Sequence, residues 1–418
     1  MPGGALADGV FCWYNFPMSF LSFLKKKNEQ SYLLFDIGSG SVGGGVVTFD
    51  DGKPKIIYTN REQFSFEREI NQKKLFANMA KALEKSASDI QKNGMSHLTF
   101  TTFGARRVKN VFCVLSAPWC LSRTRILKVR KDEPFTITPN FLERIAEAEE
   151  LEFDKDAPKI GDGLYEGKAK LSAIEKKIIK IRLNGYELRL PIFKKATNLE
   201  LSLFISVTTE EIKEAIEKAI AKIFGHQQHL EFNSFVLTSF TALRDSFPNK
   251  HDFIFMDISG EATELAFVRR QIILETASFP YGRNTLIRRL AQILKTEPAL
   301  AESSLALRLN GKTEEALKIA GDEWLKFLDA AIADFAKDDF VPVKVFLTAD
   351  PDVRKYFEEL IGRQIISQFS LEGDKLSAIS LDENVLKNYY RASGHAEIDP
   401  FILIETLFLR RLAQNSQF

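Results

Sequence analysis

The sequence predicts an α/β protein built from two similar lobes, with a separate α+β module inserted into the first. A buried strand that ends in Asp, turns through small residues and continues into a second strand occurs twice, as YLLFDIGSGSVGGGVV from Tyr32 and FIFMDISGEATELAFV from Phe253. Buried strands otherwise alternate with helices of amphipathic spacing, which is typical of α/β layers. Between about 119 and 207 this pattern gives way to short alternating strands and one helix, which indicates the insertion.

Composition and charge narrow the classes of function. The 418 residues carry 57 Lys+Arg and 56 Asp+Glu, a formal charge of +1, and 45% of them are hydrophobic. A chain of this length can bury a large core in roughly two to four domains. Its charge balance lacks the basic patch of a nucleic-acid binder, so no nucleic-acid partner is expected. Cys12, Cys113 and Cys120 lack the spacing of zinc or redox motifs, which favours a reduced compartment without a structural metal.

The leader, residues 1–30, carries the only membrane signal. No stretch reaches the roughly 18–20 apolar residues of a spanning helix. From Met18, an alternative start to Met1, the sequence continues as SFLSFLKKK, with apolar side chains before a run of lysines. Such a segment favours weak contact with an anionic bilayer interface. The alternative interpretation is a plain N-terminal extension without membrane contact.

The first lobe begins with a strand and a glycine-rich hairpin. The strand from Tyr32 runs through SGSVGGGVVTF into an antiparallel partner. A helix is expected over 70–93 with Ile70, Leu75, Met79 and Leu83 on one side, followed by a buried strand over 111–118. These elements form the first part of an α/β lobe.

The insert is expected to be an independent α+β module. RTRILKV and IIKIRLNGYELRLPI indicate alternating strands, a helix over FLERIAEAEE begins at Thr138–Pro139, and a soft Gly/Asp-rich stretch lies at 159–168. The last strand, LELSLFISV, ends at Thr208–Thr209, which with Glu211 begins a helix of regular apolar spacing. That helix returns the chain to the first lobe.

The second half repeats the first hairpin and then becomes helical. The unit over 252–274 aligns Asp257 with Asp36, and residues 286–339 read as helix only. VKVFLTAD is a further buried strand, and a last helix from Asp399–Pro400 is apolar nearly all round, as in a core helix. The expected domains are a leader at 1–30, first-lobe core at 31–118 and 208–250, an insert at 119–207, second-lobe core at 251–285 and 340–394, a reduced helical insert at 286–339, and a closing helix at 395–418 that returns to the first lobe.

The two Asp turns predict a nucleotide clamp. A carboxylate at the end of a strand, beside a turn whose backbone N–H groups converge, suits a phosphate and the Mg²⁺ that neutralises it. Two such turns facing each other would hold the tail of a nucleoside triphosphate. The alternative is a pair of plain hairpins whose glycines serve only the turns.

These motifs resemble those of the actin-like ATPase superfamily, which has a two-lobed, ribonuclease-H-like fold, and within it the cell-division protein FtsA. The resemblance runs in order over roughly residues 30–413, and the position of the insert is similar to FtsA and to the related pilus-platform protein PilM. The matching segments are two phosphate loops (DIGSGSVGGGVV and DISGEATEL), a connecting strand (VFCVLSAP), the lead into the second lobe (FPYGRNTLIRRLA), an adenosine-side strand (VFLTAD) and a closing helix (IDPFILIETLFLRRL).

The resemblance implies that the chain binds ATP with Mg²⁺. It assigns Asp36 and Asp257 to a water-shelled Mg²⁺. The remaining phosphate and adenosine contacts fall on Gly38, Ser39, Gly40, Ser41, Gly260, Thr263, Gly282, Thr348 and Ala349. No residue matches a catalytic one.

Departures from the family pattern predict that nucleotide binding is weak or lost. Ser259 stands at the first place of a usual Gly-Gly pair, and Arg283 follows Gly282 where a second glycine is common. In place of a Gly-Gly pair, the adenosine strand ends in Thr348, Ala349, Asp350 and Pro351. These residues bring side chains and an extra negative charge to the place where an anionic nucleotide would pack.

Other polar residues are weaker candidates for a catalytic or metal-binding role. No Gln or Glu near Ser116 and Ala117 is seen to orient a water, so the chain is at most a slow ATPase. The histidines of GHQQHL, His226 and His229, are more typical of a solvated helix end than of a metal site. The arginine pairs at 269–270 and 288–289 are expected to be surface charges.

The resemblance implies an FtsA-like scaffold in the cytoplasm, peripheral at the inner face of the cell membrane. Such a scaffold links division machinery to the membrane, with an FtsZ-like tubulin homologue as partner, self-association through the insert, and filaments as one expected form. The alternatives are a PilM-like platform that binds a membrane protein of a pilus or secretion system, and a nucleotide-free interaction module. A sugar or acetate kinase on the same fold is disfavoured because no acidic base stands out between the two turns.

Overall fold

The computed structural model describes most of the chain after residue 30. The described residues are 31–50, 53–98, 108, 110–160, 170–188, 190–226, 228–307, 311–337, 339–371, 373, 375–394 and 396–415. The leader with its SFLSFLKKK segment lies outside them, as does most of the Gly/Asp-rich stretch at 159–168. No helix among these residues combines the length and the apolar character that crossing a bilayer requires.

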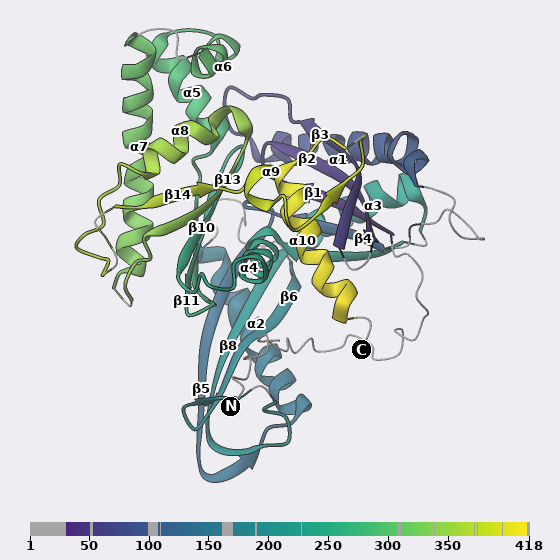
Figure 1. The fold of residues 1–418 in the computed structure, drawn as a ribbon, viewed down its shortest axis with the longest axis vertical. Helices are drawn as coiled ribbons and strands as arrows, with labels where there is room; N and C mark the ends of the chain where they lie inside the picture. The colour runs from purple at the N-terminus through teal and green to yellow at the C-terminus, as the bar shows by residue number, and fades with distance from the viewer. Residues whose placement is uncertain are drawn as a thin grey trace, which may run out of the picture.

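The first lobe is a six-stranded mixed sheet covered by helices on both faces (Figure 1). Alternate side chains of its central strand point to opposite sides, so that Phe35 packs toward α1 and α3 whereas Leu34 packs toward α10. In spatial order the strands are β15 (Arg391–Ala392), β3 (Lys53–Gln63), β2 (Ser41–Asp50), β1 (Ser31–Ile37), β4 (Asn110–Leu115) and β9 (His229–Ser234). The helices are α1 (Gln72–Lys92), α3 (Glu210–Phe224), α4 (Phe235–Ser246) and α10 (Pro400–Asn415), with a 3₁₀ turn at Gly94–His97.

The second lobe is a five-stranded sheet with a helical layer on one side. In spatial order its strands are β12 (Ile272–Phe279), β11 (Thr263–Arg269), β10 (Phe253–Ile258), β13 (Lys344–Ala349) and β14 (Ser377–Ser380). Its helices are α5 (Arg283–Leu294), α6 (Pro298–Leu307), α7 (Gly311–Phe335), α8 (Pro351–Ile361) and the short α9 (Glu383–Leu386). Helices α5, α6 and α7 span most of the region that the sequence predicted to be helical.

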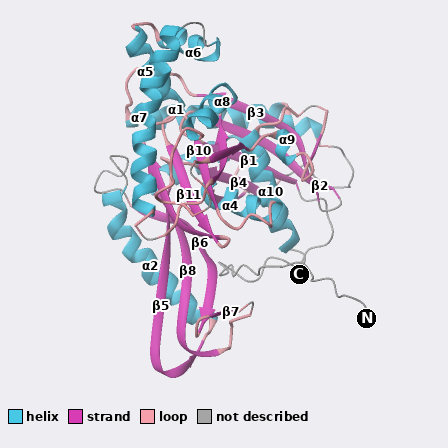
Figure 2. Ribbon diagram, turned by 60° about the vertical axis from the view of Figure 1, so that its left-hand side comes forward, coloured by secondary structure: helices cyan, strands magenta, loops and turns pink. Residues whose placement is uncertain are grey.

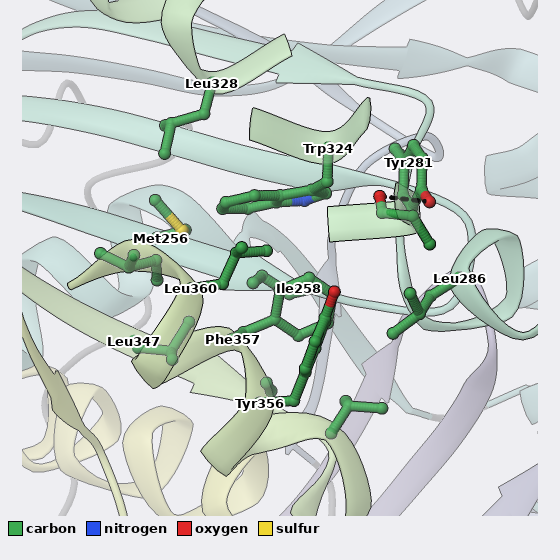
Figure 3. Packing of buried hydrophobic residues seen from close by; sticks show 14 of the residues in the cluster. Met256, Ile258, Tyr281, Leu286, Trp324, Leu328, Leu347, Tyr356, Phe357 and Leu360 are labelled. Carbon is green, nitrogen blue, oxygen red and sulfur yellow. Dashed lines mark hydrogen bonds between the residues drawn. The ribbon is translucent and has the colours of Figure 1, made fainter. Parts of the chain in front are cut away.

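A cluster of aromatic side chains packs between these helices and the sheet. Trp324 of α7 is fully buried and lies over Phe357 of α8 and beside Tyr281, as Figure 3 shows. The Trp324 indole N–H donates to Thr263 Oγ1 (3.0 Å), and the Tyr356 hydroxyl donates to a carbonyl of α7. The buried indole N–H and tyrosine hydroxyl are therefore both hydrogen-bonded, which fixes α7 against the sheet and α8 against α7.

The insert forms a four-stranded sheet that projects away from both lobes (Figures 1 and 2). One face packs on α2 (Pro139–Ile160) through alternate residues of β8, among them Leu201, Leu203 and Ile205. Thr138 Oγ1 accepts the Phe141 N–H (3.2 Å) at the predicted start of that helix. In spatial order the strands are β5 (Leu121–Thr136), β8 (Lys195–Thr209), β6 (Leu171–Leu183) and β7 (Tyr186–Glu187).

The base of the insert is anchored in the body of the protein. Trp119 and Cys120, at the start of the predicted insert, lie in the first-lobe core, and Phe204 of β8 packs in the core shared with α4. The buried Glu175 of β6 accepts the N–H and the hydroxyl of Ser234. The described contacts therefore continue from the insert into the first lobe.

Two local expectations were wrong. The helix predicted over 70–93 begins at Gln72 after an Asn71 cap, so Ile70 lies outside it and is 51% exposed. The segment LRLPI was expected to continue a strand, but only Tyr186 and Glu187 pair with β6. The predicted last helix is confirmed as a core element, because α10 is buried from Phe401 to Leu409.

Candidate functional site

The two Asp residues occupy equivalent places in the two lobes. Asp36 lies on β1 opposite Gly43 of the antiparallel β2 and Val114 of the parallel β4. Asp257 lies on β10 opposite Glu264 of the antiparallel β11 and opposite Thr348 of the parallel β13. The internal repeat that the sequence predicted is therefore confirmed in register.

The turns that follow these strands contact each other directly. Ser39 is fully buried; its Oγ accepts the Glu261 N–H (2.8 Å) and is hydrogen-bonded to Ser259 Oγ (2.8 Å). A Cβ added to Gly260 would lie 2.4 Å from the Gly40 Cα, closer than any real side chain allows. Both glycines are required for this approach of backbone to backbone, which leaves no gap between the turns at that point.

Asp36 is paired with an arginine that sequence reasoning missed. Arg61 of β3 places Nη2 2.7 Å from Asp36 Oδ2, and its Nη1 donates to Ser41 Oγ (2.8 Å). The same guanidinium binds Asp399 through Nε (2.5 Å) and Nη2 (2.8 Å), just before α10 begins. Arg61 therefore joins the first Asp turn to the closing helix.

A second carboxyl lies beside Asp36 in the same cluster. Glu405 of α10 is fully buried, and burial followed by the charge of Asp36 raises its pKa well above the usual range. Burial likewise raises the pKa of Asp36 to about 6, although Arg61 opposes the shift. Asp36 Oδ1 and both Glu405 oxygens are buried and meet no hydrogen-bond donor among the described residues.

Asp257 is buried and bonded within its own lobe. Thr348 Oγ1 donates to Asp257 Oδ1 (2.8 Å). Burial raises the pKa of Asp257 well above its usual range, while the Thr348 hydroxyl opposes the shift. Its neighbour Glu264 accepts the Ala117 N–H (3.4 Å), and burial raises the pKa of Glu264 to about 8. A glutamate from β11 therefore reaches Ala117, a position beside which the sequence itself offers none.

Arginines also surround the second turn. Arg288 is 9% exposed and forms a close ion pair with Glu261 of the turn, so the prediction that it is a surface charge was wrong. The Arg288 Nη1 also donates to the Glu67 carbonyl of the first lobe (3.3 Å). Arg283 pairs with Asp352 (2.6 Å) and lies 3.8 Å from Asp350, at the predicted adenosine side.

Two of the remaining predicted site residues, Gly38 and Gly282, lie at the turns. Two others, Thr263 and Ala349, are bonded or packed within the second lobe. Gly38 stays at the first turn, where its N–H donates to the Ser41 carbonyl (3.1 Å). Gly282 packs on the second turn, because a Cβ there would lie 2.2 Å from the Ser259 carbonyl oxygen. Thr263 is bonded within the second lobe, where its hydroxyl donates to the Tyr281 carbonyl (2.6 Å). Ala349 is buried in the β13–β10 pairing, opposite Ile258.

Some of the missed residues had a signal in the sequence. Glu405 is a single acid inside the apolar run FILIETLFL, and such a residue must be protonated or paired when the helix is buried. Arg61 and Glu261 had none, because their partners lie far away in the chain. Within the described residues no group of three or more His, Cys, Asp and Glu side chains is arranged to hold a metal ion.

The residues of this cleft do not fit Mg²⁺ and ATP as they stand. Of the two expected magnesium ligands, Asp36 already pairs with a guanidinium, and Asp257 is buried and accepts the Thr348 hydroxyl. The turns expected to cradle phosphates touch each other at Gly40 and Gly260. A cation and a triphosphate would each have to displace protein groups to enter.

The fold and the paired Asp turns define the chain as a protein of the actin-like ATPase fold. Across 92% of its length the chain is similar to PilM in the solved PilM–PilN type IV pilus biogenesis complex, with 14% sequence identity, 99% of that chain covered and a TM-score of 0.59. A more distant likeness is to the ethanolamine utilization protein EutJ from Carboxydothermus hydrogenoformans, with 12% identity, 93% and 90% of the two chains covered and a TM-score of 0.42. No protein-family model and no curated protein matches the sequence.

Proposed function

We propose that the chain is a PilM-like platform, an actin-fold scaffold that binds a membrane protein of a pilus or secretion system at the inner face of the cell membrane. The observation that carries the proposal is the correspondence with PilM over nearly the whole of both chains. That protein was solved in complex with PilN. FtsA-like division activity with an FtsZ-like partner is the second candidate, and it rests on the sequence resemblance alone.

The candidate site supports a scaffold more than an enzyme. Its buried acids, Asp257 and Glu264, have raised pKa values and are hydrogen-bonded within the fold. Asp36 is paired with Arg61. None of these groups is an exposed, ionised base within reach of a reacting water.

The insert supports a role in binding partners. Its distal end, away from the two turns, exposes Tyr186 (76%), Leu190 (69%) and Phe193 (73%) within eight residues of chain. Tyr186 belongs to β7, and Leu190 and Phe193 lie in the loop that leads into β8. Exposed apolar and aromatic side chains gathered in this way are typical of protein-binding surfaces. Self-association through the insert, filament formation and weak membrane contact through the leader remain predictions.

Deletion of the gene in the organism of origin distinguishes the two candidates. A platform predicts loss of surface pili or of secretion with normal septation, and complementation by the full chain should restore it. Long unseptated cells with intact pili and secretion would support the division scaffold and contradict the platform.

A photo-crosslinker placed at Tyr186 tests the same proposal biochemically. The platform predicts a crosslink to an inner-membrane component of a pilus or secretion system. The matched control is a crosslinker at Lys218 of α3, an exposed position on the first lobe. Equal capture from both positions would show that the insert has no specific role.

A further inference from the structure

We infer that two arginines of the chain itself occupy the expected nucleotide site, Arg61 at the place of the cation beside the first Asp turn and Arg288 as a bridge from the second turn to the first lobe, so that the chain takes no magnesium nucleotide. This goes beyond the proposed function, because a platform can be built with or without a nucleotide.

Arg61 supplies the positive charge that a bound cation would otherwise bring to Asp36. Its guanidinium contacts Asp36, Ser41 and Asp399, which come from β1, from β2 and from the segment before α10. Five N–H donors in a planar fork can serve several acceptors at once, and the group is always charged. The guanidinium carbon also lies 4.7 Å from the Phe401 ring centroid, so α10 covers it from the other side.

The glycine run of β2 makes room for this arrangement. Gly43 lies between Asp36 and Arg61 in the sheet, and a Cβ there would lie 2.6 Å from Arg61 Nη2. A Cβ on Gly45 would lie 2.8 Å from Ile402 of α10. These two glycines thus serve the packing of Arg61 and the closing helix, and not a phosphate.

The second turn holds an acid where a phosphate was expected. The Glu261 N–H donates to Ser39 Oγ, and its carboxylate accepts from Arg288 and from Asn284 Nδ2 (3.0 Å). Because Arg288 also binds the Glu67 carbonyl, one guanidinium links the turn of the second lobe to the chain of the first. At this turn the protein therefore supplies both charges, the anion from Glu261 and the cation from Arg288.

The two sets of contacts exclude the two parts of Mg-ATP for separate reasons. Mg²⁺ would approach a carboxylate already neutralised by Arg61, and like charges repel strongly in a buried site. A phosphate would have to separate Gly40 from Gly260 and compete with the Glu261 carboxylate for Arg288. The lobes are already joined without a ligand.

Calorimetric melting of the full chain tests the inference. The Tm should not shift with Mg-ATP or Mg-ADP. Arg61→Met and Arg288→Met should each lower the Tm by several degrees and speed amide exchange in residues 36–43 and 257–264, since each leaves buried carboxylates unpaired. The control is Arg68→Met, whose ion pair with Glu297 also joins the lobes but is exposed on both sides (76% and 65%) and should change neither.

A milder variant keeps the test decisive if Arg61→Met does not fold. Gly43→Ala leaves the arginine in place but crowds its Nη2, so the Tm should fall more than in Arg68→Met. A Tm that rises with Mg-ATP and loses the rise in EDTA would overturn the inference. So would Arg61→Met or Gly43→Ala melting like the Arg68→Met control.

Discussion

Replacement of the buried Glu264 by glutamine should stabilise the protein near neutral pH. The folded pKa of this group is about 8 and its unfolded value is 4.5, so folding favours the protonated form. Its contribution to stability is complete below pH 4.5 and is lost as the pH rises toward 8. At pH 7 the ionised unfolded state therefore lowers the free energy of unfolding by about 3 kcal/mol. Glutamine does not titrate, and its amide oxygen can still accept the Ala117 N–H.

The gain should appear as a pH-dependent difference in Tm. With about 2.1 cal/mol/K of unfolding entropy per residue, 3 kcal/mol corresponds to about 3–4 °C for this chain. Glu264→Gln and the natural chain should melt together at pH 4.5, and the variant should melt higher at pH 7. The matched control is Glu214→Gln, which removes an exposed carboxylate of α3 and should leave the Tm unchanged at both values. A variant that melts lower at every pH, or by the same margin at both, would refute the account of Glu264 as a neutral acid.

Three further predictions concern the cleft and the insert. Thr348→Val removes the donor to Asp257 and should reduce the free energy of unfolding by about 1–2 kcal/mol in urea titrations, and an unchanged midpoint would contradict that bond. Gly44→Ala places a Cβ 2.4 Å from Ser86 Oγ and should cost about 1–3 kcal/mol in the same assay, part of which Ser86→Ala should restore if the clash is real. Phe193→Asn, at an exposed residue with a φ of 62°, should change stability by no more than about 0.5 kcal/mol while partner capture falls; undiminished capture would remove Phe193 from the binding surface.

The parts of the fold that local sequence pattern controls were predictable. The two Asp hairpins, the helical region after Phe279 and the apolar last helix each follow from a run of residues that is contiguous in the chain. The burial of the last helix follows from a run of residues that is apolar nearly all round. The local errors were Ile70, which lies before the Asn71 cap, and the segment LRLPI, which does not continue a strand.

The chemistry of the cleft was not predictable in the same way. Arg61 and Asp399 meet across 338 positions of sequence, and Arg288 meets Glu67 across 221. No periodicity connects such residues. The run of glycines suggested a phosphate turn, yet at Gly43 and Gly45 the space is taken by Arg61 and Ile402. A glycine-rich strand allows another group to approach the backbone closely, but the sequence does not identify whether that group is a ligand or a side chain of the protein.

As a scaffold of the proposed kind, this actin-fold chain should bind its partner without a nucleotide. The most direct measurement is the affinity of the purified full chain for the cytoplasmic segment of the membrane protein captured at Tyr186, taken with Mg-ATP and again in EDTA without nucleotide. The account predicts the same dissociation constant in both conditions, and the same again for Asp36→Asn. An affinity that rises with Mg-ATP, and loses that rise in Asp36→Asn, would contradict it.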